Sequence, residues 1–117
     1  MHNDIQPNFR LWIYSPARPG VFGDGKVRLL EAIARTGSLQ LAARELGISY
    51  RKAWGDLKKA QSALGIALIE QHRGGSQGGR TVLTVEGKRW LCAYSRFRRE
   101  VEAAVQASFE RFAGEVE

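Results

Sequence analysis

The sequence predicts a mainly α-helical domain with small β-hairpins and one long helix at its C-terminal end. Three observations support this fold class. Apolar residues recur at helical spacing in three segments between residues 26 and 64, and only short glycine turns separate these segments. Alternating apolar and polar residues surround turn-forming loops within residues 9–23 and 67–84. Beyond residue 84, apolar residues recur every three or four positions as far as residue 108.

Composition and charge limit the functional classes. The chain has 117 residues, which fits one domain with a single modest core. Its 18 Lys and Arg residues outnumber 12 Asp and Glu residues, and the net charge of +6 favours a polyanionic partner. No apolar run approaches the roughly 18 residues of a membrane span, and the N-terminus is no signal peptide, so we expect a cytoplasmic protein without a membrane partner. Cys92 is the single cysteine, and we expect no disulfide framework, no metal and no cofactor.

The first predicted element is a hairpin across residues 9–23. In "NFRLWIY", Phe9, Leu11 and Ile13 alternate with the residues of the opposite face, as in a half-buried strand. The turn-forming stretch "SPARPG" follows, and "VF" returns as a second strand. Asp24 then stands where its side chain can cap a helix that begins beside it.

Three helices are predicted next, in close succession. The segment "KVRLLEAIART" places Val27, Leu30 and Ile33 on one stripe, Leu29 widens this stripe, and Gly37 ends the helix. The second helix, "LQLAAREL", and a third helix of about 15 residues complete the set.

A tight turn joins the second helix to the third. Ser38 is placed to cap the second helix, and Gly47 permits a left-handed turn after it because glycine has no Cβ that would clash. Ile48 closes the turn against the core, and Ser49 caps the third helix. This order predicts a helix-turn-helix, with an ordinary helical hairpin as the alternative. The expected inward residues are Leu39, Ala42, Ala43, Leu46, Ala53, Leu57, Ala60 and Leu64, and the expected outward cations are Arg51, Lys52, Lys58 and Lys59.

A second hairpin is predicted in "IALIEQHRGGSQGGRTVLT". Residues 67–71 and 81–84 form its strands, and "RGGSQGGR" forms the loop between them. A phosphate-binding P-loop fits poorly, because its glycines precede Lys-Ser or Lys-Thr and a helix, whereas Arg80 precedes a strand. A basic hairpin directly after a helix-turn-helix is a wing, so the sequence predicts a winged helix-turn-helix.

The last predicted element is a helix that begins near Thr84. A helix of some 28 residues would be ~40 Å long at about 1.5 Å per residue, which is more than so small a core can cover. We therefore divide the chain into residues 1–83, the winged domain, and residues 84–117, a dimerisation helix. The alternative is a single helix that lies on its own domain. The apolar seam expected at the dimer interface consists of Trp90, Tyr94, Phe97, Val101, Ala104 and Ser108.

These segments resemble the N-terminal domain of ModE-type molybdate-responsive regulators, which share a LysR-like winged helix-turn-helix. The stretches "TGSLQLAARELGISYRKAW" and "LIEQHRGGSQGGRTVLTVEGKRWL" are similar to two signature stretches of that family, and the resemblance covers residues 21–95. It implies a dimeric bacterial transcription regulator of molybdate- or tungstate-related genes, with its third helix in the major groove. Such regulators carry a further sensor domain. This chain ends at Glu117 without one, so we expect its signal from a separate effector or sensor protein, or from the rest of a longer protein.

The expected partner is double-stranded DNA. Arg51 and Lys52 lie in the first turns of the predicted recognition helix, where either can donate to O6 and N7 of guanine. The wing and the preceding helix are expected to contact phosphates, and Trp54 is expected in the core. The side chains predicted at the DNA surface are Ser38, Arg44, Ser49, Tyr50, Arg51, Lys52, Lys58, Arg73, Gln77 and Arg80.

Two other classes of function were weighed against DNA binding. An enzyme is not expected, because His2 and His72 are the only histidines and no carboxylate pair, nucleophile motif or metal-ligand cluster is visible. A protein-interaction adaptor that assembles through the C-terminal helix is the alternative function.

Overall fold

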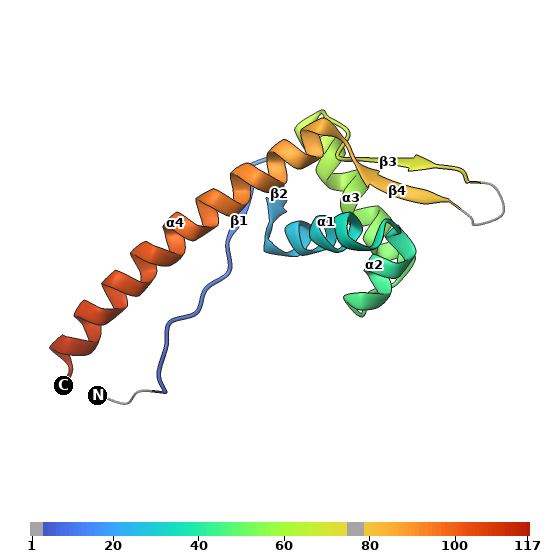
Figure 1. The fold of residues 1–117 in the computed structure, drawn as a ribbon. Helices are drawn as coiled ribbons and strands as arrows, with labels where there is room; N and C mark the ends of the chain where they lie inside the picture. The colour runs from blue at the N-terminus through green and yellow to red at the C-terminus, as the bar shows by residue number, and fades with distance from the viewer. Residues whose placement is uncertain (1–3, 75–78) are drawn as a thin grey trace.

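The computed structural model describes residues 4–74 and 79–117, and it consists of a helical domain, two antiparallel hairpins and a protruding helix (Figure 1). The elements are β1 (Trp12–Ser15), β2 (Arg18–Gly23), α1 (Asp24–Thr36), α2 (Leu39–Glu45), α3 (Tyr50–Leu64), β3 (Ile69–His72), β4 (Arg80–Leu83) and α4 (Val85–Glu115). The predicted fold class, a winged helix-turn-helix with a long C-terminal helix, is confirmed.

The core lies among the three helices of the helix-turn-helix unit. Leu30 and Ile33 of α1 are fully buried, as are Ala42 of α2 and Leu57 of α3. Small side chains let the helix axes approach closely, because alanine leaves little bulk between the two backbones. Trp54 is partly buried and packs against this core, as expected.

Local sequence signals set the ends of these helices. Gly37 ends α1 with a φ of 70°, and Gly47 has a φ of 69° in the turn before α3. A residue with a Cβ is strained in this left-handed region, so glycine suits both turns. Ser38 and Ser49 accept hydrogen bonds from the backbone N–H groups of Leu41 and Lys52, each at 3.0 Å. The predicted caps at Ser38 and Ser49 and the predicted turns at Gly37 and Gly47 are confirmed.

The first strand of the N-terminal hairpin is shorter than predicted, and the second is longer, because residues 18–20, which the sequence predicts in the turn, belong to β2. β1 pairs with β2 in antiparallel register, with Trp12 opposite Gly23 and Ser15 opposite Arg18. The residues before Trp12 form an extended arm instead. Asp24 holds this arm at Leu11, because the Leu11 N–H donates a hydrogen bond to the Asp24 carboxylate at 3.1 Å.

The predicted capping role of Asp24 is wrong. Gly23 is the N-cap of α1 and Asp24 is the first helical residue, with no side-chain cap hydrogen bond. Its carboxylate is used for long-range contacts: besides the Leu11 amide, it accepts from the Tyr94 hydroxyl and from Arg98, whose Nε lies 2.9 Å away. This cluster joins the arm, the start of α1 and α4.

These contacts determine the pKa of Asp24. Partial burial alone would raise the pKa, but hydrogen bonds from Arg98, Tyr94 and the Leu11 amide outweigh it and lower the pKa of Asp24 from 3.8 to about 2. Because the folded-state pKa is depressed, the ionised carboxylate stabilises the fold above pH 4, and this stabilisation is lost as the pH falls towards 2.

Asp24→Asn should therefore lower the free energy of unfolding by about 2 kcal/mol at pH 7. The difference from wild type should shrink between pH 4 and pH 2, since the protonated carboxyl group resembles the amide. Urea denaturation across this pH range is the measurement. Asp56→Asn is the matched control, because Asp56 forms only an exposed ion pair with Lys52 and should show little pH-dependent difference. A constant deficit for Asp24→Asn at every pH would contradict this account.

The strands of the wing are shifted from the predicted ranges by one or two residues. Residues 67 and 68 were predicted in the strand, but they form the link between α3 and β3. There the Gln61 side chain accepts from the N–H groups of Leu68 and Ile69, at 2.8 and 3.2 Å. Thr84, also predicted in a strand, is the N-cap of α4 and accepts from the Gly87 N–H at 2.9 Å.

The base of the wing is fixed to the start of α2. The Thr81 N–H donates to the Gly37 carbonyl at 2.9 Å, and the Leu39 N–H donates to the Thr81 hydroxyl at 3.2 Å. Thr81 is itself buried. The wing and the helix-turn-helix therefore form one unit.

The long helix α4 has 31 residues and extends well beyond the domain (Figure 1). Its first half packs on its own chain: the ring centroids of Trp90 and Tyr94 lie 5.4 and 5.5 Å from that of Phe22. Phe97 contacts Tyr94 edge-on but stays exposed. The first residues of the predicted seam, Trp90 and Tyr94, thus pack within their own domain, as expected for a helix that lies on its own chain. The seam residues from Val101 onwards lie beyond the domain.

Candidate nucleic-acid interface

The exposed face of α3 is the centre of the candidate site. Arg51 and Lys52 are exposed in its first turn, directly after the Ser49 cap. Lys52 forms an ion pair with Asp56 at 3.3 Å, whereas the Arg51 side chain has no hydrogen bond or ion pair within residues 4–74 and 79–117. A cation near a helix N-terminus gains nothing from the helix dipole, so this position suits an external negative group better than it suits the fold.

Three hydroxyl groups at the starts of α2 and α3 are further candidates for contact with DNA. Tyr50 is 49% exposed, so its hydroxyl group is accessible for a hydrogen bond with an external group. Ser38 and Ser49 accept the capping hydrogen bonds of α2 and α3, and each still has its own hydroxyl hydrogen to donate. Capping and contact with a phosphate oxygen are therefore compatible at both serines.

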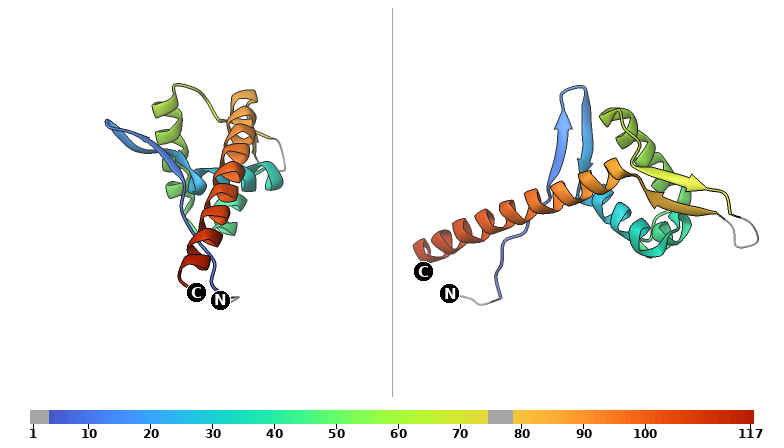
Figure 2. Two further views of the ribbon diagram at one scale, coloured as in Figure 1. Left: turned by 90° about the vertical axis from the view of Figure 1, so that its left-hand side faces the viewer. Right: turned by 45° about the horizontal axis from the view of Figure 1, so that its top comes forward.

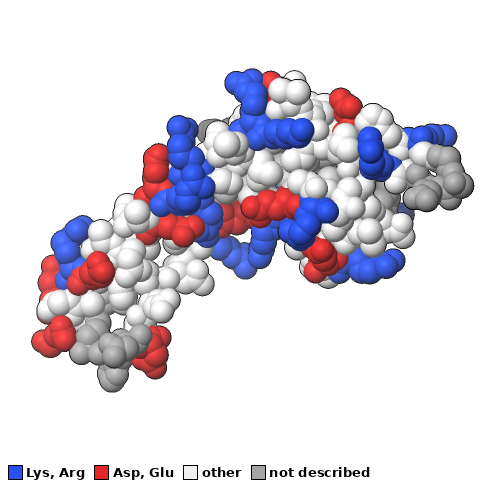
Figure 3. All heavy atoms as spheres, viewed as in Figure 1, with Lys and Arg blue, Asp and Glu red and all other residues white. Residues whose placement is uncertain are grey.

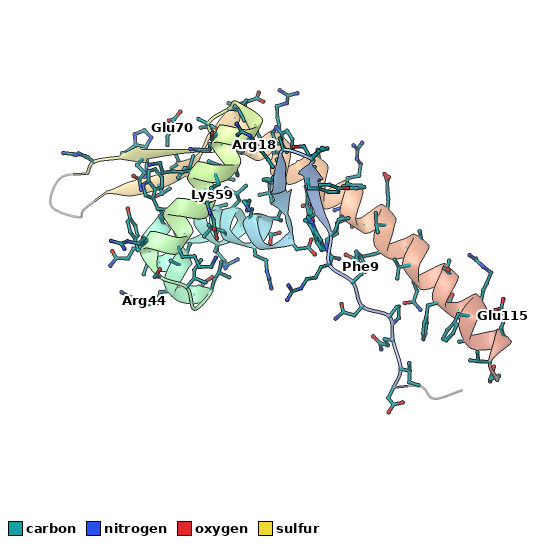
Figure 4. The ribbon with its side chains drawn as sticks, turned by 180° about the vertical axis from the view of Figure 1, so that it is seen from behind. Phe9, Arg18, Arg44, Lys59, Glu70 and Glu115 are labelled. Carbon is teal, nitrogen blue, oxygen red and sulfur yellow. The ribbon has the colours of Figure 1, made fainter. Side chains whose placement is uncertain are left out.

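Further cations extend the same surface. Arg44 is exposed at the end of α2 and Lys58 is exposed on α3. Figure 4 views the molecule with α3 in front, and the labelled Arg44 and Lys59 lie on this side. The predicted cations of α2 and α3 are thus all exposed, and the spacing of Arg51 and Lys58 places these two on one face of α3.

The wing carries the remaining predicted residues. Arg73 and Arg80 are exposed where β3 and β4 meet the loop. The pairing of β3 with β4 ends at His72, which lies opposite Arg80. Gln77 lies outside the described residues. In Figure 3, Lys and Arg atoms lie among uncharged atoms at the wing end of the molecule, whereas Asp and Glu atoms gather at the far end of α4. The charge separation predicted from the sequence is present on this face.

Other kinds of site are not visible in the described part of the chain. Residues 4–74 and 79–117 contain no group of three or more His, Cys, Asp or Glu side chains arranged to hold a metal ion. Within the same residues, none of the helices combines the length and the apolar character that a membrane crossing requires.

Sequence reasoning missed several long-range contacts of the fold. The Asp24, Tyr94 and Arg98 cluster joins positions 70 or more residues apart, and no local pattern marks such a contact. Arg18, in the N-terminal hairpin, donates to the Ser62 hydroxyl of α3 at 3.5 Å and was not assigned a role. Its position in a turn before a strand gave no sign of proximity to α3.

The sequence was compared with protein families and curated proteins. The family model "Bacterial regulatory helix-turn-helix protein, lysR family" matches residues 25–88. The chain is 39% identical over 89 residues to the molybdenum-pterin-binding protein MopB of Rhodobacter capsulatus, covering 76% of this chain and 33% of that protein. It is 36% identical over 88 residues to the molybdenum transport protein ModE of Azotobacter vinelandii, with 75% and 33% coverage. The chain thus spans about a third of the length of these relatives.

Solved structures with the same fold include two DNA-binding domains crystallised with DNA. The CbnR domain superimposes with a TM-score of 0.53 at 23% identity, covering 78% of this chain and 95% of that chain. The BenM domain, bound to benA site 1 DNA, gives a TM-score of 0.56 at 24% identity, with 76% and 93% coverage. These likenesses establish the winged fold, and the family model establishes the relationship. The chain belongs to the lysR family of bacterial regulatory helix-turn-helix proteins.

Proposed function

We propose that the chain binds double-stranded DNA sequence-specifically and is the DNA-binding part of a ModE-type bacterial transcription regulator. The observation that carries this proposal is the exposed first turn of α3, where Arg51 has no partner in the described residues and Tyr50 stands exposed beside it. A regulator of this family acts by binding rather than by catalysis, so the chain is not an enzyme. It works in the cytoplasm, where the bacterial chromosome lies.

Arg51 is the residue best placed to contact a base. Its planar guanidinium can donate two parallel hydrogen bonds to O6 and N7 of guanine in the major groove. Lys52 can turn from Asp56 to the DNA, because an exposed ion pair of this kind contributes less than about 1 kcal/mol. Arg44, Lys58, Arg73 and Arg80 hold phosphates, which position the domain without specifying sequence.

The second half of α4 supports a homodimer. At about 1.5 Å per residue the helix is ~46 Å long, and Val101, Ala104 and Ser108 lie on one stripe of the part beyond the domain. Phe112, 53% exposed, continues this stripe four residues after Ser108. A second copy of the helix would cover the apolar side chains of this stripe, Val101, Ala104 and Phe112, and the small side chain of Ser108. Because Trp90 and Tyr94 already pack on Phe22, the interface between copies begins near Phe97.

The relatives' names support a proposal about the regulated genes. MopB is named for binding a molybdenum pterin and ModE for molybdenum transport, so we assign this chain to the control of molybdate- or tungstate-related genes. The chain matches about a third of each relative, and a separate effector or sensor protein remains part of this proposal.

Selection of bound fragments from random genomic DNA, followed by footprinting and sedimentation, tests this proposal. We expect a dimer that protects an inverted repeat with half-site centres about 34 Å apart, or a multiple of that distance. A monomer that protects a single half-site would refute the dimer. Bound fragments without a shared sequence would refute specific binding. If DNA did not retain the chain in a salt-sensitive way, the adaptor function would be favoured instead.

A further inference from the structure

The N-terminal hairpin lies beside α3, on the side opposite the wing. In the right-hand view of Figure 2 and in Figure 4, α3 stands between β1–β2 and β3–β4. The hairpin precedes residues 25–88, which the family model matches. Its role is therefore not explained by the winged fold itself.

A basic hollow lies where the hairpin meets α3. It measures about 490 Å³ and is lined by Arg18 of β2 and by Lys58, Lys59 and Ser62 of α3, with the hairpin backbone at Gly20 and Val21. Arg18 Nη1 lies 3.5 Å from the Ser62 hydroxyl, which places the guanidinium over the helix. Figure 4 shows Arg18 and Lys59 near each other on this side of the molecule.

The charges around this hollow are uncompensated within the described structure. No carboxylate is among the residues that line it, and Lys58 and Lys59 make no ion pair with any residue of 4–74 or 79–117. Neighbouring like charges repel one another, so the fold gains nothing from gathering three cations here. A negatively charged ligand would remove this repulsion.

The hollow continues the surface that holds Arg51. Positions 51, 55, 58 and 62 of a helix share one face, so the exposed side of α3 leads from Arg51 past Lys58 to the hollow. Eleven residues of helix cover about 16 Å. The major groove is about 12 Å wide, so a helix with its first turn in the groove brings its other end to the flanking sugar-phosphate backbone.

We propose that the β1–β2 hairpin is a second DNA-contacting element, and that Arg18, Lys58 and Lys59 bind phosphates of the duplex strand flanking the major groove, opposite the strand contacted by the wing. This inference rests on the proposed DNA-binding function. Lysines present compact charges on flexible stems, so the surface adds affinity and little base specificity. Duplex DNA is thus held from both sides of α3.

Arg18→Ala and Lys59→Ala, singly and together, test this inference. The ligands are a 30-base-pair duplex containing the selected site and a scrambled duplex of equal length, titrated by fluorescence anisotropy at several salt concentrations. Each lost phosphate contact should make the slope of log affinity against log salt shallower by about 0.9. Affinity should fall by similar factors on both duplexes. Arg111→Ala, at the far end of α4, is the matched control and should leave the slope unchanged.

The outcomes separate the two proposals. If the wild type binds the selected site and both variants keep the wild-type slope, the hairpin is not a DNA contact and this inference is wrong, while the proposed function stands. If the wild type binds no duplex, the proposed function fails and the inference fails with it. Lys59 is an exposed side chain without a partner in the described residues, so the Lys59→Ala result is independent of any folding defect caused by Arg18→Ala.

Discussion

Replacing Gly87 with alanine should destabilise the folded chain by about 1–3 kcal/mol or more, because a new Cβ would be forced into a filled space. A Cβ at Gly87 would lie 2.2 Å from the carbonyl oxygen of Leu68 and 3.1 Å from its carbonyl carbon. Both are backbone atoms, which cannot rotate away as a side chain can. The same carbonyl oxygen accepts the Thr84 N–H at 3.0 Å, so moving it also disturbs the start of α4.

Gly114→Ala is the matched control for this change. Gly114 lies in the same helix, and a Cβ there would meet nothing within 4 Å. Alanine is the better helix former by roughly 0.5–1 kcal/mol, so Gly114→Ala should be neutral or stabilising. Thermal and urea unfolding of both variants is the measurement. If Gly87→Ala unfolded at the same midpoint as wild type, the close approach of α4 to the α3–β3 link would be incorrect.

Arg51→Ala should cost about 1–3 kcal/mol in binding to the selected DNA site, while the melting temperature stays the same or rises slightly. The side chain is exposed and has no partner in residues 4–74 and 79–117, so its removal takes nothing from the fold. It also removes a positive charge from the N-terminal end of α3, where the helix dipole disfavours cations. The loss on scrambled DNA should be smaller if the contact is to a base.

Melting curves and titrations on selected and scrambled duplexes measure both effects together. Arg111→Ala again serves as the control, since it removes the same charge at the far end of α4 and should change neither affinity nor stability by much. A clear loss of stability with unchanged DNA affinity would show that Arg51 supports the fold, and the assignment of α3 as the recognition helix would lose its main support.

The sequence predicted the helix-turn-helix closely because its signals are local. Ser38 and Ser49 cap helices that begin at the next residue, and Gly37 and Gly47 occupy left-handed turns that disfavour a Cβ. Each of these features depends on neighbours within a few positions. The same is true of the start of the long helix: the sequence predicts it near Thr84, which is the N-cap of α4 rather than the end of the preceding strand.

Features that depend on distant residues were missed. Asp24 fits the pattern of a capping residue, yet its carboxylate binds Tyr94 and Arg98, which only the folded chain brings near. Gly87 resembles any exposed helical glycine until Leu68 is seen against it. The heptad pattern of α4 is genuine, but packing on Phe22 and pairing with another helix require the same apolar spacing.

The central claim is that α3 and its flanking hairpins bind duplex DNA with sequence preference. The most direct test is a titration of the unmodified chain with its selected duplex and a scrambled duplex under the same salt conditions. We predict that the selected duplex binds at least about 10³-fold more tightly, and that both affinities fall steeply as salt rises. Equal affinity for the two duplexes, or binding to neither of them, would contradict this account.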